Sequence, residues 1–339
     1  MSYRVAVLGA TGLVGRTMLE LLEARDFPTD DPVLLASERS ASRQLPFRGR
    51  SLTVQAVSAE AFVGIDFALF ASANAVSQAW AGQAQANGAR VVDNSSAYRY
   101  VDAIPLVIPE INGGLLDARP PLVANPNCST IAIVMALAPL DRAAGLERVV
   151  VSTYQSVSGA GAEAVEELEA GIRAGFPGPP PPRAGGLPPF AFTVVPQIDR
   201  FEANGYSREE MKIVWETRKI LGLGDLPITA TAVRVPVRIG HAASINVTLK
   251  RAMEPDEARA LWKNTPGILV VDDPAGGRFP TPLEAAGLDD VLVGRARRDL
   301  SQARGLEVFV ASDNLRKGAA LNAVQILERM STDSGGCRS

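Results

Sequence analysis

Cysteine and histidine are scarce in this sequence. The 339 residues include two cysteines, Cys128 and Cys337, and one histidine, His241. Cys337 lies in the polar stretch STDSGGCRS, so we expect no disulfide framework and a reducing, cytoplasmic setting. We also expect no metal site.

Long apolar runs and an excess of charge of one sign are missing as well. The formal net charge is −3, and no basic stretch supplies the patch that a nucleic-acid partner needs. The longest apolar stretches have about 10 residues, against roughly 20 for a membrane span. The first residues, MSYRVAVLG, lack the charged and then apolar regions of a signal peptide. We therefore expect no nucleic-acid partner, no membrane span and no signal peptide.

The chain changes character near residue 125. At roughly 100–200 residues per domain, its length suggests two domains. Before residue 125, short apolar runs alternate with helical patterns, which predicts a parallel sheet with helices on both faces. The strands are expected at 4–8, 32–36, 65–71 and 90–93, and the helices at 13–24 and 77–87.

Beyond residue 125, strand-like runs follow one another with few helices between them, which predicts a mixed, largely antiparallel sheet. The Pro/Gly-rich segment 175–189 is expected to be an irregular excursion at the surface. The last helix is expected at about 317–330. The strands are expected at 149–157, 192–198, 228–237, 244–251, 268–272, 291–297 and 306–312.

One helix in this second part is clearly marked, at 208–221. Ser207 and Glu210 form a capping box at its start, and Gly222 can end it. Glutamates and lysines recur along it at helical spacing, which is mostly typical of a solvated face. They are Glu209, Lys212, Glu216 and Lys219.

A glycine motif, Gly9-Ala-Thr-Gly-Leu-Val-Gly15, joins the first expected strand to the first expected helix. Glycines at such a turn let the backbone approach a pyrophosphate, and the helix N-terminus supplies N–H donors. The spacing is GxxGxxG and not the commoner GxGxxG, so the strand–turn–helix context carries the prediction of a dinucleotide site. The alternative is a glycine-rich turn without a ligand.

The second expected strand ends in Ala36-Ser-Glu-Arg-Ser40. An acidic residue here favours the ribose hydroxyls of NAD, and an arginine flanked by serines favours the 2′-phosphate of NADP. Both kinds of residue are present. We expect NADP, bound through Ser37, Arg39 and Ser40; the alternative is a solvated charged loop.

Cys128 stands in Asn125-Pro-Asn-Cys-Ser-Thr130, directly before the helical run IAIVMALAPL. A helix N-terminus favours the thiolate, which is the nucleophilic form of cysteine. A buried structural cysteine is the commoner alternative, although such a cysteine usually has apolar neighbours. Both interpretations stay open at this point.

His241 follows Arg234-Val-Pro-Val-Arg-Ile-Gly240, just beyond an expected strand. A Cys/His pair is the usual way to build an activated thiolate. A lone histidine without a role is the common alternative, and the spacing does not show that His241 meets Cys128.

Nine segments, in order over most of the chain, carry a resemblance to a known family. They are VAVLGATGLVG at 5–15, DNSSAYR at 93–99, IPEIN at 108–112, NPNCST at 125–130, TYQSVSGAG at 153–161, VVPQID at 194–199, EEMKIVWETRKIL at 209–221, RVPVRIGH at 234–241 and SDNLRKGAALNAVQI at 312–326. Together they resemble the aspartate-β-semialdehyde dehydrogenase family.

The resemblance implies a reversible reaction in which aspartyl-4-phosphate and NADPH give aspartate-4-semialdehyde, phosphate and NADP. Cys128 would attack the acyl phosphate and form a thioester, which hydride then reduces. His241 would protonate the oxygen as the aldehyde departs, and Gln155 would orient the substrate at Cys128.

Binding roles are implied in the same way. Arg234 would hold the substrate α-carboxylate through two parallel hydrogen bonds. Glu209 would face the α-ammonium and Lys212 the phosphate, from one face of a helix. The remaining residues implied are Arg99 and Asn127 beside the phosphate; Gly9, Thr11, Gly12, Leu13 and Val14 for the cofactor phosphates; Ser158 and Gly159 for the nicotinamide end; and Asn314 for the carboxamide.

The fold implied is α/β, in two domains. A Rossmann-like NADP-binding domain would cover 1–127 and be completed by a C-terminal helix at 314–330. An α+β catalytic and dimerisation domain would cover 128–313. Members of the family are usually homodimers or homotetramers, and their pathway feeds lysine, threonine and methionine synthesis and, in bacteria, the diaminopimelate of the cell wall.

Three other functions compete with this one. An N-acetyl-γ-glutamyl-phosphate reductase would share the cofactor and the cysteine chemistry, but its acylated substrate amine needs no carboxylate such as Glu209. A non-catalytic nucleotide-binding paralogue would be expected to have lost its nucleophile, whereas Cys128 and His241 are both present. A glyceraldehyde-phosphate-type dehydrogenase shares the thioester logic but not the segments quoted.

Overall fold

The computed structural model describes residues 2–175, 183 and 186–332. The chain forms two units. Unit 1 consists of the described residues of Met1–Asn127 and Ala319–Ser339, and unit 2 is Cys128–Gly318.

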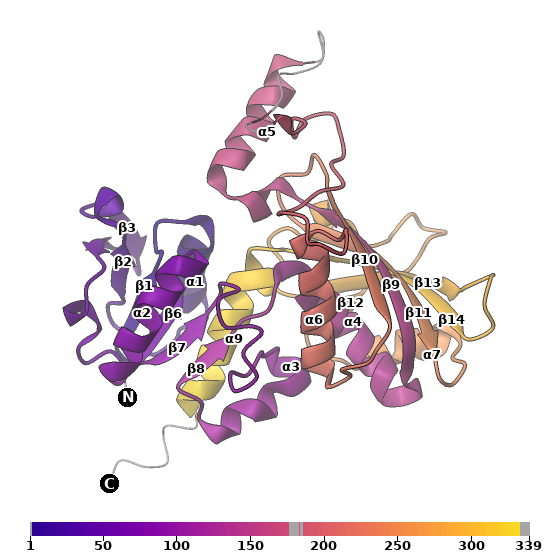
Figure 1. The fold of residues 1–339 in the computed structure, drawn as a ribbon, viewed down its shortest axis with the longest axis horizontal. Helices are drawn as coiled ribbons and strands as arrows, with labels where there is room; N and C mark the ends of the chain where they lie inside the picture. The colour runs from indigo at the N-terminus through magenta and orange to yellow at the C-terminus, as the bar shows by residue number, and fades with distance from the viewer. Residues whose placement is uncertain (1, 176–182, 184–185, 333–339) are drawn as a thin grey trace. The chain divides into compact units, whose positions relative to one another are not determined.

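A six-stranded parallel sheet forms the centre of unit 1, in the order β5-β2-β1-β6-β7-β8 (Figure 1). In β1 (Val5–Leu8) every side chain is buried. Val5 and Val7 pack with residues of α1 and α9, while Ala6 and Leu8 pack with residues of α2 on the other face. A strand that is covered on both faces reads as a continuous apolar run, which is why the sequence revealed these strands.

The expected elements of unit 1 are confirmed, with α1 at the expected bounds, but four strands (β3, β4, β5 and β8) and the short helix α3 were missed. Strands β3, β4 and β5 are short and partly exposed, and β8 has only three residues. The C-terminal helix begins with a π-helical turn, Arg316–Ala320, before α9. The elements are α1 (Leu13–Ala24), β2 (Val33–Ala36), the hairpin β3 (Gln44–Phe47) and β4 (Arg50–Thr53), β5 (Gln55–Ala56), β6 (Phe67–Phe70), α2 (Asn74–Ala86), β7 (Arg90–Asp93), α3 (Pro109–Asn112), β8 (Leu122–Ala124) and α9 (Leu321–Thr332).

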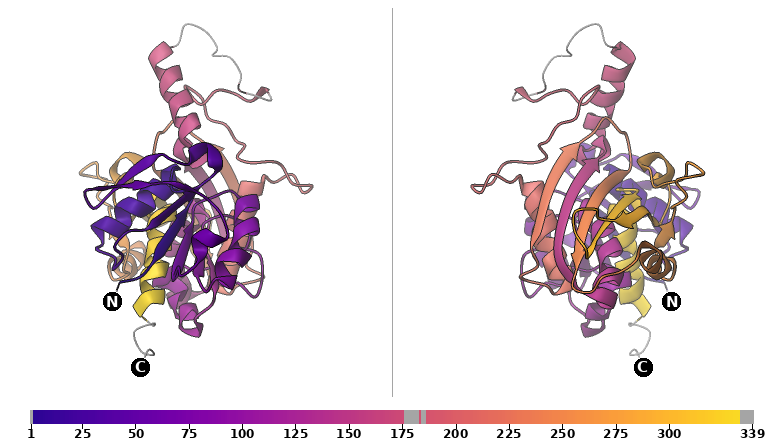
Figure 2. Two further views of the ribbon diagram at one scale, coloured as in Figure 1. Left: turned by 90° about the vertical axis from the view of Figure 1, so that its left-hand side faces the viewer. Right: turned by 90° about the vertical axis from the view of Figure 1, so that its right-hand side faces the viewer.

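Unit 2 is built on a second six-stranded sheet, in the order β10-β9-β11-β14-β13-β12. The pairs β9–β10 and β12–β13 are parallel and the other pairs are antiparallel, so the expected mixed sheet is confirmed. Helices α4, α6 and α7 pack against the sheet (Figures 1 and 2). The elements are α4 (Cys128–Ala144), β9 (Leu146–Gln155), α5 (Ala162–Ala174), α6 (Arg208–Leu221), β10 (Ile228–Arg234), β11 (His241–Leu249), α7 (Pro255–Lys263), β12 (Ile268–Val270), α8 (Pro282–Ala285), β13 (Val291–Arg298) and β14 (Gly305–Ser312).

Helix α6 has the expected bounds. Ser207 accepts from the Glu210 N–H, Glu210 accepts from the Ser207 N–H, and Gly222 ends the helix with φ +70°. The capping box and the glycine stop are therefore confirmed, because both depend on local chain geometry.

Other expectations for unit 2 were wrong. Residues 192–198 form no strand and contribute one isolated bridge, from Val195 to Arg234. Pro196 lacks an N–H for a ladder, and Phe192 has φ +61°. Helices α5 and α7 were not expected, and β11 begins at His241, three residues earlier than expected. Of the proline-rich segment 175–189, most lies outside the described residues.

In the described part of the chain, no helix is both long enough and apolar enough to cross a membrane.

Candidate active site

Cys128 is the first residue of α4, as expected, and its side chain is half-buried. The helix behind it is buried almost throughout, so its position is set by the core of unit 2. Gly318 lies against it: a Cβ at residue 318 would come within 3.1 Å of the Cys128 Cβ. The helix dipole favours negative charge at the first turn of a helix, which suits a thiolate at this position.

Three more expected residues meet at one edge of the sheet of unit 2. Strands β9 and β10 are parallel and end in register, with Gln155 opposite Arg234. Strand β11 runs antiparallel to β9 and begins at His241, next to this end. Strand pairing therefore brings together residues that lie far apart in the sequence.

Helix α6 adds a carboxylate and an ammonium to this edge. Gln155 Nε2 donates to Glu209 Oε1 (3.2 Å), and Lys212 Nζ donates to Glu209 Oε2 (3.0 Å). Lys212 Nζ also donates to Asp199 Oδ2 (3.0 Å), a residue that the sequence did not single out. Glu209 is only 4% exposed and Glu216 is fully buried, so the expectation of a solvated face was wrong.

These neighbours change the ionisation of Lys212. Burial by itself lowers the pKa of the ammonium, but the carboxylates of Glu209 and Asp199 outweigh it and raise the pKa. Lys212 is therefore cationic and already held by two carboxylates. An incoming anion has to compete with Asp199 for it.

Arg234 is a buried cation at the same edge. Burial lowers the pKa of its guanidinium, and negative charge on Glu209 and Cys128 acts in the opposite direction. Its Nη1 donates to the Ser156 carbonyl (2.6 Å). Exposed Gly159 lies over it: a Cβ there would be 3.1 Å from Arg234 Nη1 and 3.3 Å from His241 Nε2.

His241 is 2% exposed, and burial, followed by the charge of Arg234, lowers its pKa to about 3. Its Nδ1 accepts from the main-chain N–H of Ser156 (3.0 Å). Asn314 links the residues next to His241 and Ser156. Its Oδ1 accepts from the Gly240 N–H (2.9 Å), and its Nδ2 donates to Ser158 Oγ (2.9 Å). The sequence analysis also missed Ser156. Its place next to Gln155 in the chain gives no sign that it contacts His241, which lies 85 residues away in the sequence.

Two of the expected phosphate-binding residues lie in unit 1. Arg99 is buried, and its Nη2 donates to the Asn94 carbonyl (2.8 Å). Asn127 is also buried. The loop that carries Arg99 is anchored by Asp93, which accepts from the hydroxyls of Ser77 and Ser95 (2.7 Å each).

The glycine motif fits a dinucleotide phosphate group. Gly9 has φ +88°, and a Cβ there would lie 2.3 Å from the Ala71 carbonyl oxygen. A Cβ at Gly15 would lie 2.2 Å from the Gly9 carbonyl oxygen. Exposed Gly12 is the N-cap of α1, and no side chain caps that helix. The first turn, with Leu13 and Val14 beside Thr11, is thus a backbone cradle with its N–H groups open to an anion.

The residues expected at the 2′-phosphate follow β2. They form a short 3₁₀ turn, Glu38–Ser40, in which Ser37, Glu38 and Arg39 are exposed. Within the part of the chain that the structure describes, Arg39 makes no hydrogen bond or ion pair. Its guanidinium is available to a ligand.

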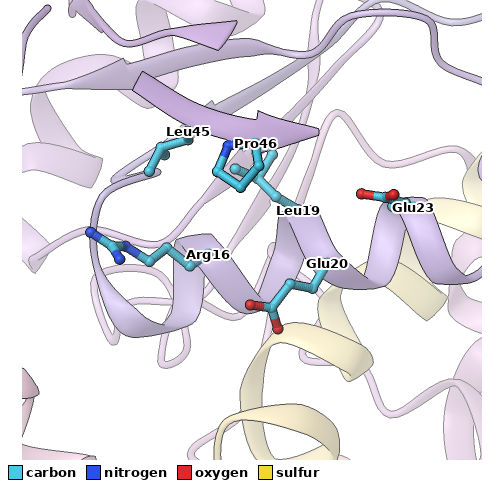
Figure 3. A pocket seen from close by; sticks show the side chains of 6 residues that line it. All are labelled: Arg16, Leu19, Glu20, Glu23, Leu45 and Pro46. Carbon is cyan, nitrogen blue, oxygen red and sulfur yellow. The ribbon is translucent and has the colours of Figure 1, made fainter. Parts of the chain in front are cut away.

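A pocket of about 180 Å³ lies elsewhere in unit 1, between α1 and β3 (Figure 3). Leu19 points towards Pro46 there, and Arg16 and Leu45 line one end. Glu20 and Glu23 also line it and outnumber the one guanidinium, so it offers an anionic cofactor no net attraction.

Comparison with known proteins bears on the family. Residues 4–118 match the model described as "Semialdehyde dehydrogenase, NAD binding domain", and residues 137–317 match "Semialdehyde dehydrogenase, dimerisation domain". An aspartate-semialdehyde dehydrogenase of Aquifex aeolicus is 48% identical over 97% of this chain and 98% of that protein.

The chain belongs to the aspartate-semialdehyde dehydrogenase family.

Other members of the aspartate-semialdehyde dehydrogenase family agree. The Bacillus subtilis relative is 46% identical over 96% of each chain. A crystal structure of aspartate semialdehyde dehydrogenase II from Vibrio cholerae, complexed with ASA, has a TM-score of 0.92 at 42% identity and covers 98% of this chain and 99% of that one. The resemblance, the oxidoreductase class and the fold class of the sequence analysis are confirmed.

Proposed function

We propose that this enzyme catalyses the NADP-dependent, reversible reductive dephosphorylation of aspartyl-4-phosphate to aspartate-4-semialdehyde through a thioester on Cys128. The observation that carries the proposal is the set of groups in unit 2. A half-buried cysteine at a helix N-terminus, a buried guanidinium, a buried carboxylate paired with an ammonium, and a buried imidazole belong to one cluster.

The chemistry assigns one task to each group. The Cys128 sulfur forms a bond to the acyl carbon, phosphate leaves with the electron pair of the broken C–O bond, and a thioester remains. Bound NADPH supplies the hydride that reduces this thioester. The carbon–sulfur bond then breaks, the aldehyde departs and the thiolate is restored. Gln155 orients the substrate, and His241 acts as a donor to the carbonyl oxygen.

The charges suit a small zwitterion that carries a phosphate. Arg234 matches an α-carboxylate, Glu209 an α-ammonium, and Lys212 a phosphate, with Arg99 and Asn127 of unit 1 assigned to the same anion. A buried Glu209 supports this choice over an N-acylated substrate, because an amide offers that carboxylate no positive charge.

Arg234→Lys tests the carboxylate assignment. Lysine keeps the charge but lacks the two parallel donors, so we expect the KM for aspartate-4-semialdehyde to rise roughly tenfold or more, with a smaller change in kcat. Arg238→Lys is the matched control, because the Arg238 side chain is two-thirds exposed and pairs with Glu169. An unchanged KM in Arg234→Lys would place the carboxylate elsewhere.

The cofactor is proposed to be NADP, bound by the cradle of Gly9, Thr11, Gly12, Leu13 and Val14, with Ser158, Gly159 and Asn314 at the nicotinamide end. Ser37, Arg39 and Ser40 are assigned to the 2′-phosphate. The open guanidinium of Arg39 supports this assignment, and the neighbouring Glu38 opposes it, so the residue needs a direct test.

Arg39→Ala should raise the KM for NADP by roughly tenfold, the worth of one charge-assisted hydrogen bond, and leave the KM for NAD nearly unchanged. Arg50→Ala removes an equal charge from an arginine that pairs with Asp31 and serves as the control. Equal effects of Arg39→Ala on both cofactors would contradict the assignment.

The reaction itself is tested by assaying the purified protein with aspartate-4-semialdehyde, phosphate and NADP, with NAD in parallel, while NADPH absorbance is followed. Phosphate-dependent reduction of NADP is the expected result. Activity only with N-acetylglutamate semialdehyde would assign the enzyme to the sister reductase. Absence of activity with both substrates would indicate a nucleotide-binding paralogue.

We further propose that the enzyme acts in the cytoplasm in the synthesis of lysine, threonine, methionine and diaminopimelate.

The assembly is proposed to be a homodimer or homotetramer that uses the sheet of unit 2. Tyr154 of β9 is 37% exposed and its ring stacks on Phe309 of β14, with centroids 6.0 Å apart. Tyr154→Glu should move the protein towards the mass of a single chain in light scattering. Val63→Glu, a similar change at an exposed apolar residue of unit 1, should not. An unchanged mass in Tyr154→Glu would exclude this patch.

A further inference from the structure

The two ring nitrogens of His241 have different surroundings. Nδ1 lies 3.0 Å from the main-chain nitrogen of Ser156, which can only donate a hydrogen bond. Nε2 is buried and has no hydrogen-bond partner within the described residues, and a Cβ on exposed Gly159 would lie 3.3 Å from it. A proton on Nδ1 would face the N–H of Ser156 directly. The single ring proton of the neutral imidazole therefore belongs on Nε2.

A network behind the ring supports this arrangement. The Gly240 N–H donates to Asn314 Oδ1, and this fixes which atom of the Asn314 amide is the oxygen. Ser156 Oγ lies 3.0 Å from both Asn314 Oδ1 and His241 Nδ1. With Nδ1 already accepting from the main chain, the Ser156 hydroxyl can donate to Asn314.

We propose that the Ser156 main-chain N–H, supported by Asn314, fixes His241 as the Nε2–H tautomer, so that the ring donates a hydrogen bond to the reacting oxygen and is not the base that forms the Cys128 thiolate. Ser156 and Asn314 are thereby positioning residues. The inference rests on the proposed thioester reaction and refines the role of His241 in it.

The proton balance of the reaction agrees with a donor role. Attack of the thiolate on the acyl phosphate places a negative charge on the carbonyl oxygen, and so does hydride addition to the thioester. Each oxyanion collapses by expelling phosphate or thiolate and regains a neutral carbonyl. The departing phosphate takes up its proton from solvent, so neither step transfers a proton to or from the ring. What both steps need is a donor aimed at the oxygen.

The thiolate is stabilised by other groups. Cys128 begins α4, where the helix dipole favours negative charge. The charges of Cys128 and Arg234 also interact, since negative charge on Cys128 opposes the lowering of the Arg234 pKa by burial. An imidazolium is disfavoured at His241, because burial and Arg234 lower its pKa to about 3. In the Nε2–H tautomer Nδ1 accepts from Ser156 and Nε2 carries the proton, so the ring has no free lone pair for the thiol proton, which leaves to solvent.

Nitrogen-15 NMR of histidine-labelled enzyme tests the tautomer directly. His241 is the only histidine, so its two ring nitrogens need no assignment by mutation. We expect a protonated Nε2 and an unprotonated Nδ1 from about pH 5 to about pH 8. Ser156→Ala keeps the main-chain N–H and should keep this pattern. A protonated Nδ1, or an imidazolium near neutral pH, would overturn the proposal.

Cys128 alkylation at varied pH tests the origin of the thiolate, in a Cys337→Ser background. The pH midpoint should be nearly equal with His241 and with His241→Asn. A Cys/His ion pair would instead make the midpoint rise by roughly 1–3 units in the variant. Such a rise would overturn the proposal. Neither this test nor the NMR test requires turnover, so both remain decisive if the proposed reaction fails.

Rescue by an amide tests the donor role in catalysis. In His241→Gln an amide N–H can reach the position of Nε2, whereas in His241→Asn the amide reaches only that of Nδ1. We expect kcat of His241→Gln to exceed that of His241→Asn by roughly tenfold or more, a fraction of the usual worth of one oxyanion donor. Equal rates would show that the ring does more than donate.

Discussion

Cys128→Ala should abolish turnover, with kcat falling by roughly 10⁶, because loss of the nucleophile removes the covalent route altogether. Binding of NADPH should persist, since the glycine cradle lies in unit 1 and the fold of that unit does not involve the sulfur. The side chain is half-buried and alanine is a good helix former, so the protein should remain folded. The measurement pairs a steady-state assay with a fluorescence titration of NADPH.

Cys337→Ala is the matched control for this substitution. It removes the other thiol of the chain, which lies in a polar sequence and has no assigned role. We expect its kcat and KM to equal those of the unmodified enzyme. Undiminished activity in Cys128→Ala would remove the nucleophile assignment, and loss of NADPH binding would mean that the substitution had disturbed the fold.

His241→Ala should slow the reaction by roughly 10²–10⁴, the range for loss of a positioned acid, base or oxyanion donor. The effect should fall on kcat more than on KM, because the developing oxyanion and not the ground-state substrate needs the ring. The ring is fully buried, so its removal leaves a cavity, and thermal unfolding has to show that the variant is still folded. A loss below tenfold would make His241 a bystander.

The pH dependence of kcat and of the free energy of unfolding tests the lowered pKa of His241 independently. Because its pKa is lowered to about 3, the ring stays neutral at every pH above that value, and its protonation should produce no break in kcat near the ordinary value of about 6.5. In the unfolded chain the pKa of His241 has its ordinary value of about 6.5. Above that pH the neutral ring makes its full contribution to the free energy of unfolding. That contribution is lost as the pH falls from about 6.5 towards 3. A kcat limb near 6.5 that vanishes in His241→Ala would contradict the lowered pKa.

The elements that the sequence predicted best are those that depend on local chemistry. Helix α6 has the expected bounds because Ser207, Glu210 and Gly222 satisfy or redirect the backbone at its two ends. Strands β1 and β6 were recognised because burial on both faces leaves an unbroken apolar run. Residues 192–198 misled the prediction, because apolar composition alone does not supply ladder partners.

In the candidate site, too, the sequence predicted the features that depend on adjacent residues better than those that depend on tertiary contacts. The glycine motif of residues 9–15 and the placing of Cys128 at the start of a helix follow from residues that are adjacent in the chain. The roles of the separate segments came from the family resemblance. The spacing of Glu209 and Lys212 predicted a solvated face, and burial against the sheet reversed that expectation.

The sequence by itself thus determined the two-part α/β organisation, the dinucleotide motif, the position of the cysteine and the family, since these are written in neighbouring residues. The tertiary structure alone decided that Gln155, Arg234 and His241 share one edge, because the register of β9, β10 and β11 sets that edge. It also decided the tautomer of His241 and the pairing of Lys212 with Asp199. Both depend on hydrogen bonds of about 3 Å between residues far apart in the chain, and no periodicity encodes them.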